Sequence, residues 1–359
     1  MTAFLIILIA ALLAISIWQI SKIFKLGKAP DQDTELSEVA NDNDNKRNGQ
    51  GMLIFVISMY IMMIACFVGY SDYFLPDAGS EHGAEYDNLL LLTTVVIMVT
   101  QVFTQGLLHW FSYKYHGKKS QRALFYADND RLEFIWTAIP VVVLSGLILW
   151  GLFSWNDIMD ANTDDDPIIV EVYAYQFGWK IRYGGEDQTL GDANVRFIEG
   201  VNELGIDPTD ADGVDDIFTN EALHLPVNRP VLFKFRSQDV LHSAYMPHFR
   251  AQMNVVPGMV TQFKFTPTVT SEEYRSTEFM TAKVRKINEI RRQKSKELMA
   301  DGDVPLDPYE FQYYLLCNKI CGKSHYNMQI NIVVETEEEF NEWLATQKTF
   351  EQKLASAEN

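Results

Sequence analysis

The chain has 359 residues, of which 47% are hydrophobic, and a formal net charge of -18. This length suffices for one or two domains with hydrophobic cores. The acidic excess argues against nucleic-acid binding and favours a basic soluble partner. Apolar residues are concentrated roughly before position 155 and acidic residues after it, which predicts a membrane part followed by a soluble part.

Four apolar segments are each close to the ~20 residues that a helix needs to cross a bilayer. They run Ala3–Ile20, Met52–Tyr70, Leu89–Phe111 and Phe134–Trp155. The near absence of charge within them favours membrane spans over buried core helices. The first segment could be a cleaved signal peptide, but its positive charges follow the apolar run instead of preceding it. We therefore predict a retained helix with its N-terminus outside, followed by a flexible cytoplasmic linker at 29–51.

The loops between the apolar segments predict the orientation. Positions 111–133 carry five Lys or Arg side chains, whereas positions 71–88 are acidic and contain neither. The positive-inside rule places 111–133 in the cytoplasm and everything after Trp155 outside. Glu133, in LEFIWTAIP, then lies at the cytoplasmic end of the fourth segment. It is either an interfacial carboxylate favoured by the helix dipole or a point at which protons enter.

Beyond Trp155 the pattern is typical of β-strands. Short β-branched and aromatic runs are separated by turn residues, and they cover Ile168–Tyr183, His224–Ser237, Met259–Pro267, Glu310–Cys317 and Met328–Glu335. Several short strands in succession predict a small β-barrel or sandwich. A polar helix is predicted over Glu337–Leu354. The fold class is therefore membrane-anchored α + β, with transmembrane helices followed by an extracytoplasmic β-domain.

Two insertions interrupt the predicted β-domain. Gly185–Asn220 is strongly acidic, and its DPTDADGVDD stretch suggests calcium. However, Pro208 and Thr219 occupy positions where an EF-hand needs ligands, so we favour a solvated acidic loop. The second insertion contains a basic helix at Ala282–Ala300, which could contact a partner subunit or lipid headgroups, or could simply be a solvated surface helix.

The stretch CNKICGKSHYNM, from Cys317 to Met328, combines thiols, an imidazole and a thioether in one loop. A Cys317–Cys321 disulfide is permitted outside the membrane, but it does not explain His325 and Met328. Zinc accepts Cys and His, whereas a thioether is a poor zinc ligand. Thiolate, imidazole and a weak thioether together select copper. Two thiolates could bridge two coppers, each of which would then need its own imidazole, and His242 in SQDVLHSAYMP offers the second.

At these motifs the sequence resembles subunit II of the haem-copper cytochrome c oxidases, over about Leu89–Trp343. The family motif C-x-E-x-C-G-x-x-H-x-x-M is matched by CNKICGKSHYNM except at its Glu. DVLHS matches at Asp239–Ser243, and LEFIWTAIP is similar to the family's E-x-I-W-T-x-x-P. The resemblance implies a transmembrane hairpin followed by a cupredoxin domain that carries a dinuclear copper centre, CuA.

The resemblance also implies a domain organisation and a set of copper ligands. The expected parts are an N-terminal transmembrane helix with its linker (1–51), a second transmembrane helix with an outer loop (52–88), a transmembrane hairpin (89–160), a cupredoxin CuA domain (161–345) with insertions near 185–220 and 268–309, and a C-terminal helical tail (346–359). By resemblance, both cysteines bridge the coppers. One copper is then served by His242 and Met328, and the other by His325 and the backbone carbonyl of Lys319.

Two residues depart from the family pattern. Lys319 stands where the family has a Glu that also binds magnesium or manganese, which argues against that ion here; we hypothesise that the Lys319 ammonium replaces it. Phe177 stands where the family has the Trp at which electrons enter. Trp179 is retained, either as part of this electron-accepting region or as a core aromatic.

The function implied by the resemblance is electron acceptance within an oxidase. Electrons from cytochrome c, or from a cytochrome-bearing donor complex, would reach CuA and then haem a of subunit I, where oxygen is reduced to water with proton pumping. Subunits I and III and membrane lipid would be its partners. The chain would lie in the bacterial inner membrane with its copper domain on the periplasmic side, and Glu133 would be the entrance of the K-type proton channel. The alternatives are a quinol-oxidase subunit II without copper and a membrane-tethered copper-delivery protein.

Overall fold

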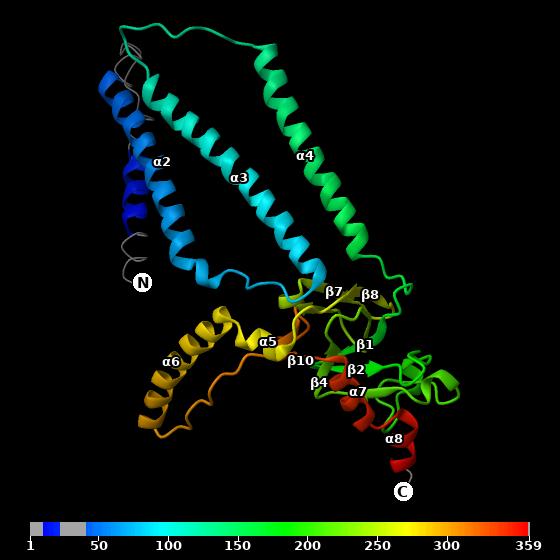
Figure 1. Cartoon of the computed structure of the whole chain (residues 1–359). Helices are drawn as coiled ribbons and strands as arrows, with labels where there is room; N and C mark the ends of the chain where they lie inside the picture. Colours follow the sequence, from blue (N-terminus) through cyan, green and yellow to red (C-terminus); the bar gives the residue numbers. More distant parts are fainter. Residues whose placement is uncertain (1–9, 22–40, 358–359) are drawn as a thin grey trace. The chain divides into compact units, whose positions relative to one another are not determined.

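The computed structural model describes residues 10–21 and 41–357 (Figure 1). The chain divides into two compact units. One unit comprises Met1–Tyr73 and Val95–Trp136, and it is built mainly of long apolar helices. The other comprises Phe74–Thr94 and Thr137–Asn359, and it contains both β-sheets.

Three helices in the described part of the chain are long and apolar enough to cross a membrane. They are α2 (Asp42–Tyr70), α3 (Glu81–Lys114) and α4 (Asp130–Ile158), and a shorter apolar helix covers Ala10–Ser21. At ~1.5 Å per residue each of the three exceeds the ~30 Å of a bilayer's hydrocarbon core. Their large apolar side chains are mostly exposed, as lipid contact requires. Three of the four predicted segments are confirmed as helices, and the beginning of the first lies outside the described residues.

Helix α2 begins inside the segment 29–51, which the sequence predicts to be a flexible linker. The side chain of Asn41 caps the helix by accepting a hydrogen bond from the Asp44 N–H at 2.9 Å. About two turns later α2 lies close to α3, because a Cβ added to Gly49 would lie 3.0 Å from the Ser112 carbonyl oxygen. Capping and this close packing extend the helix through 42–51, where the linker prediction is wrong. Residues 29–40 lie outside the described residues.

The β-domain consists of two five-stranded sheets. The first has the order β3-β2-β1-β5-β8 and the second the order β4-β10-β9-β6-β7. The parallel pairs are β1 with β5 and β10 with β4, and the other pairs are antiparallel. The strands of the first sheet, in spatial order, are Ile217–Thr219, Gly178–Tyr183, Ile168–Tyr175, Val231–Ser237 and Thr261–Phe265. Those of the second are Ala222–Pro226, Gln329–Glu335, Tyr313–Cys317, His242–Met246 and Ala251–Val255.

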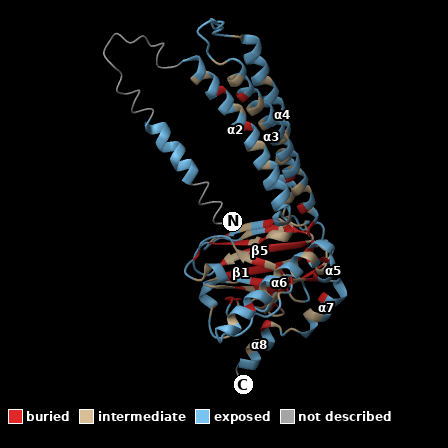
Figure 2. Ribbon diagram, turned by 90° about the vertical axis from the view of Figure 1, so that its left-hand side faces the viewer, coloured by how far each residue is buried: buried red, intermediate tan, exposed pale blue. Residues whose placement is uncertain are grey.

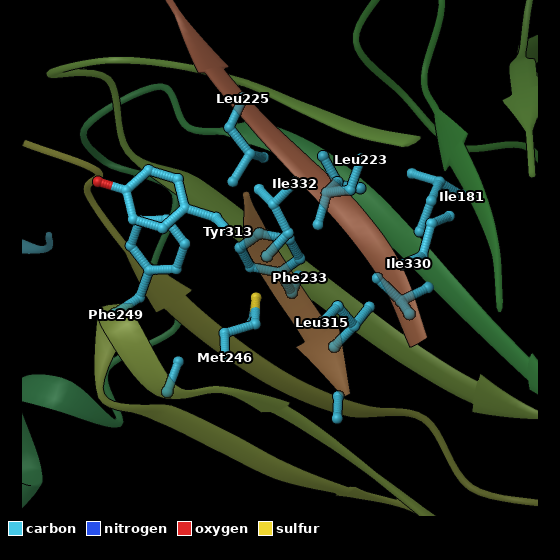
Figure 3. Close-up of a cluster of buried hydrophobic side chains, with 14 of the residues drawn as sticks. Ile181, Leu223, Leu225, Phe233, Met246, Phe249, Tyr313, Leu315, Ile330 and Ile332 are labelled. Atoms are coloured by element: carbon cyan, nitrogen blue, oxygen red, sulfur yellow. The ribbon is translucent and has the colours of Figure 1, made fainter. Parts of the chain in front are cut away.

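The hydrophobic core lies between these two sheets. Phe233 and Ile181 from the first sheet meet Leu223, Leu315 and Ile332 from the second (Figure 3), and all five are fully buried. Figure 2 shows buried residues along β1 and β5, whereas the helices are mostly exposed. The predicted sandwich is confirmed. Strands β3, β6 and β7 are additional to the predicted ones.

The acidic insertion is not simply a solvated loop. Leu204 and Ile206 are buried and pack with Tyr173 and Phe350 in a second, smaller core. The insertion is also tied to β2, because the Arg182 guanidinium lies 3.0 Å from the carboxylate of Asp216. Its apolar side chains are few and scattered along an acidic segment, so their burial leaves only a weak pattern in the sequence. The expectation of a purely solvated loop is therefore corrected.

The predicted helices outside the membrane are found with altered boundaries. The basic helix α6 spans Glu278–Ala300 and follows the short α5 (Ser271–Ser276); the side chain of Thr277 caps it. The predicted C-terminal helix is two helices, α7 (Glu337–Thr346) and α8 (Phe350–Ala357). The chain leaves α7 at Gln347, in extended backbone conformation, so that Phe350 can enter the smaller core.

The segment between α2 and α3 is bound to the β-domain. The Arg250 guanidinium donates to both carboxylate oxygens of Asp87, at 2.9 and 2.7 Å, and to the Pro76 carbonyl at 2.6 Å. The Gly79 N–H donates to the His248 carbonyl at 2.7 Å. These contacts hold the beginning of α3 against the loop that follows β6.

Candidate metal centre

Two strands and one loop bring the predicted ligands together at one end of the second sheet. His242 is the first residue of β6 and Cys317 is the last residue of β9. The Asn318 N–H donates to the Ser243 carbonyl at 2.9 Å, and the Cys317 N–H donates to the Met328 carbonyl at 3.0 Å. The sheet ladder therefore fixes both ends of the 317–328 loop beside His242.

The donor atoms of the five predicted side chains form one group. The Cys317 Sγ lies 3.8 Å from the Cys321 Sγ and 3.8 Å from the His242 Nδ1. The Cys321 Sγ lies 3.7 Å from the His325 Nδ1 and 3.7 Å from the Met328 Sδ. The structure thus brings together every side chain that the sequence predicts as a copper ligand.

The backbone at Lys319 also reaches this group. Its carbonyl oxygen lies 3.2 Å from the Cys317 Sγ, which donates to it. The Lys319 side chain is exposed, and the next side chain, Ile320, is 88% exposed. The loop therefore turns a carbonyl toward the sulfurs and its side chains toward the outside.

The spacing of the sulfurs tests whether a metal fits. Both cysteines are free, and 3.8 Å is far longer than the ~2.05 Å of a disulfide bond. Metal–thiolate bonds of ~2.3 Å in a tetrahedral site would separate two sulfurs by about 3.8 Å. The donors are two thiols, two imidazoles and a thioether, a soft set that suits copper. The residues therefore fit a copper site.

Part of the site is shielded from water, which affects the protonation of the Cys321 thiol. His242, Cys321 and Met328 are all less than 10% exposed. Burial, together with the adjacent Cys317 thiol, raises the pKa of the Cys321 thiol to about 11. In the metal-free chain this thiol is therefore protonated at neutral pH, and a metal ion must displace its proton to bind the sulfur.

Asp239 orients the buried imidazole. Its Oδ1 lies 2.8 Å from the His242 Nε2, which leaves Nδ1 facing the sulfurs. Burial alone would raise the pKa of Asp239, but hydrogen bonds from His242 and from the N–H groups of Val240 and Gln176 lower it. The carboxylate therefore stays ionised and holds the ring, as carboxylates behind metal-binding histidines do.

Two aromatic residues from the β1–β2 hairpin lie beside the ligands. Trp179 is 2% exposed, and its ring centroid is 6.2 Å from that of His242 in an edge-on arrangement. Phe177 packs against the loop, because a Cβ added to Gly322 would lie 2.7 Å from its Cζ. Gly322 has a φ of +144°, which also favours glycine. Trp179 is thus a core aromatic that also borders a predicted ligand.

The remaining predicted residue is not part of this group. Glu133 is an exposed residue in the first turn of α4 and belongs to the helical unit. Sequence reasoning missed the roles of Asp239 and Gln176 around the ligands. An Asp three positions before the predicted ligand His242 was an available signal for Asp239. Gln176 begins the stretch that resembles the family's aromatic patch, but that resemblance does not indicate its contact with Cys321.

The fold and the site define a class of protein, a membrane-anchored cupredoxin-like domain with a copper-type ligand set. Residues 70–156 match the family model described as cytochrome c oxidase subunit II, transmembrane domain. The chain is 31% identical over 240 residues to the alternative cytochrome c oxidase subunit 2 of Bradyrhizobium diazoefficiens. This match covers 66% of this chain and 71% of that protein. The chain therefore belongs to the cytochrome c oxidase subunit II family.

More distant relatives agree in name. The chain is 21% identical over 311 residues to cytochrome c oxidase subunit 2 of Synechocystis sp., covering 82% of each chain. Among solved structures, the periplasmic domain of subunit II of cytochrome oxidase (CoxB) of Bradyrhizobium japonicum is 18% identical, with a TM-score of 0.30, and the match covers 51% of this chain and 94% of that chain.

Proposed function

We propose that this chain is the subunit through which electrons enter a haem-copper cytochrome c oxidase. The main observation in support is the pair of cysteine sulfurs 3.8 Å apart, each with a histidine nitrogen 3.7–3.8 Å away. A dinuclear copper centre, CuA, supplies one-electron redox chemistry when it is bound there. The family membership supports the same role, because the relatives are named as oxidase subunits.

The chain's own residues hold this centre in a set arrangement. Cys317 and Cys321 would be the thiolate ligands shared by both coppers, and the Met328 thioether and the His242 imidazole would serve one of them. His325 and the Lys319 carbonyl would serve the other. The β-sheet ladder anchors both ends of the loop that carries these donors beside His242 before metal binds. Such preorganisation keeps the site from rearranging when its charge changes.

The donor of electrons is a cytochrome c or a cytochrome-bearing complex. The net charge of -18 favours a basic docking face on that donor. Phe177 packs against the residue that follows the ligand Cys321, and Trp179 borders the ligand His242. This aromatic pair is the electron-accepting region, and the acceptor beyond the copper site is haem a of subunit I.

The membrane part serves the same complex. In the proposed arrangement α3 and α4 lie in a bacterial inner membrane beside subunit I, with subunit III in the same assembly and the β-domain in the periplasm. Glu133, exposed in the first turn of α4, is the cytoplasmic entrance of a K-type proton channel in an oxidase that reduces oxygen to water and pumps protons. The Lys319 ammonium takes the place of the magnesium ion that the family's Glu binds.

Copper loading of the full-length chain in detergent tests the proposal. We expect two coppers per chain and an electron paramagnetic resonance spectrum in which one unpaired electron couples to both copper nuclei. Cys321→Ser should abolish this spectrum. Cys66→Ser, a matched change at the exposed free cysteine of α2, should leave it intact.

Two other results would contradict the proposal. A single copper with a mononuclear spectrum, retained by a chain that purifies without haem-containing subunits, would favour a copper-delivery protein. A chain that binds no copper but purifies with an active quinol oxidase would favour a quinol-oxidase subunit.

A further inference from the structure

The two-residue turn between β1 and β2 lies beside both segments that supply copper ligands. Register pairs Tyr175 with Gly178, so the turn consists of Gln176 and Phe177 alone. Neither residue is among the predicted copper ligands. Gln176 nevertheless makes two hydrogen bonds that reach the ligand segments from different sides.

Gln176 bonds to one ligand directly and to another through one intermediate. Its side-chain Nε2 donates to the Cys321 carbonyl at 2.5 Å. Its backbone N–H donates to the Asp239 Oδ2 at 2.7 Å, and the Asp239 Oδ1 lies 2.8 Å from the His242 Nε2. A continuous chain of hydrogen bonds therefore runs from the β6 ligand, through the turn, to the loop ligand.

The loop at Cys321 needs this outside support. The next residue is Gly322, whose missing Cβ leaves its backbone unusually free. The neighbouring side chains of Lys319, Ile320 and Lys323 are exposed, so they do not fix the loop by burial. If the Cys321–Gly322 peptide rotated, the Cys321 side chain would change direction relative to His242. The Gln176 amide opposes that rotation by binding the carbonyl, and the Phe177 ring covers Gly322.

We propose that Gln176 is a positioning residue for the copper centre. Its side chain sets the orientation of the Cys321 peptide, while its backbone N–H holds the Asp239 carboxylate that orients His242. This inference rests on the proposed copper function, because it concerns how the ligand positions are maintained. It predicts that Gln176 affects the electronic properties of the centre without contacting the metal.

The test compares Gln176→Met with Gln262→Met in the full-length, copper-loaded chain in detergent. Methionine keeps the length of glutamine and removes its amide. Gln262 is an exposed residue of the edge strand β8, so it controls for the substitution itself. For Gln176→Met we expect two coppers per chain, altered copper hyperfine splitting, a several-fold shift in the reduction equilibrium and several-fold faster copper loss to a chelator. Gln262→Met should match the wild type in all four.

Measurement of the metal-free proteins separates positioning from simple structural support. If Gln176→Met lowers only the melting temperature, equally with and without copper, and leaves the spectrum and reduction equilibrium like those of Gln262→Met, the inference is wrong. If Gln176→Met does not fold, Gln176→Glu is the second variant, because it keeps the side-chain length and replaces the hydrogen-bond donor with a carboxylate. An unchanged copper spectrum in Gln176→Glu also overturns the inference. A wild-type chain that lacks the two-copper spectrum refutes the proposed function itself, whereas a normal wild-type spectrum with an unaffected variant refutes this inference alone.

Discussion

Arg182 on β2 lies between two buried carboxylates, and its removal should lower the free energy of unfolding by an amount that depends on pH. Its guanidinium is 3.0 Å from Glu171 and 3.0 Å from Asp216, and all three side chains are at most 4% exposed. Arg236 also binds Glu171, at 2.7 and 2.8 Å. Arg182→Met therefore leaves Glu171 paired, whereas Asp216 keeps only the Gly191 N–H at 3.2 Å.

The magnitude follows from this asymmetry. Removing one partner of a buried ion pair costs ~3–5 kcal/mol, and because Arg236 remains we expect ~3 kcal/mol of the free energy of unfolding at pH 8. Burial raises the pKa of Asp216 to about 7 even beside Arg182, and loss of Arg182 raises it further. At pH 5.5 Asp216 is protonated and neutral, so the cost should fall to the ~1 kcal/mol of a lost hydrogen bond.

The sign of the pH dependence can be checked by proton linkage. The folded pKa of Asp216 lies above its unfolded value of ~3.9, so the folded state binds more protons than the unfolded state between the two. Stability therefore declines as pH rises through that window. In Arg182→Met the decline in stability continues above pH 7, because the pKa of Asp216 in the folded variant is higher than in the folded wild type.

The assay is urea unfolding of the detergent-solubilised chain at pH 5.5 and pH 8, followed by tryptophan fluorescence. Arg229→Met is the matched control, since Arg229 pairs with the half-exposed Glu337 and should cost less than ~1 kcal/mol at either pH. If Arg182→Met cost the same at both pH values, or more at pH 5.5, the argument from Asp216 would be refuted.

Three further predictions concern the loop, the core and the C-terminal helix. Gly322→Ala should cost ~2 kcal/mol in thermal unfolding, because its Cβ would lie 2.7 Å from Phe177; Gly258→Ala, with positive φ but open space, should cost less, and an equal cost would contradict a steric cause. Burial, with nearby Lys283 and Arg250, lowers the pKa of His248 to about 4, below ~6.5 in the unfolded chain. The folded state then binds fewer protons than the unfolded state, so stability should fall by up to ~3 kcal/mol from pH 6.5 to pH 4. His248→Phe should flatten this pH dependence of stability, and an unchanged dependence would contradict the role of His248. Trp343→Ala removes a ring stacked 3.8 Å from the His224 ring and should lower the free energy of unfolding by ~2–3 kcal/mol. Amide hydrogen exchange in α7 should become faster, and exchange protection equal to that of the wild type would show that this stacking does not stabilise α7.

The sequence predicted the features that depend on local pattern. Uninterrupted apolar segments identified the membrane helices, because the length of such a run is set by the thickness of the bilayer. Alternation and β-branched residues identified most strands. The boundaries were less accurate, since caps such as Asn41 and Thr277 extend helices beyond their apolar or charged stretches.

The candidate ligands were also predictable, because four of the five side chains lie within one twelve-residue motif. The combination of thiol, imidazole and thioether groups indicates a class of metal regardless of how the chain folds. The fifth, His242, follows from the need for a second imidazole and from the family resemblance. Its position as the first residue of β6 is not evident from the sequence, since that strand is short.

The tertiary structure decided what surrounds the ligands. Gln176 reaches Cys321 across 145 residues of sequence. Away from the ligands, Asp216 reaches Arg182 across 34 residues in the same way. Such contacts depend on which strands pair and in which register, and a residue's neighbours along the chain carry no information about that pairing. The sequence by itself therefore determined the membrane segments, the β-rich class and the ligand chemistry. Only the packing of two sheets decided which polar side chains lie beside those candidate ligands.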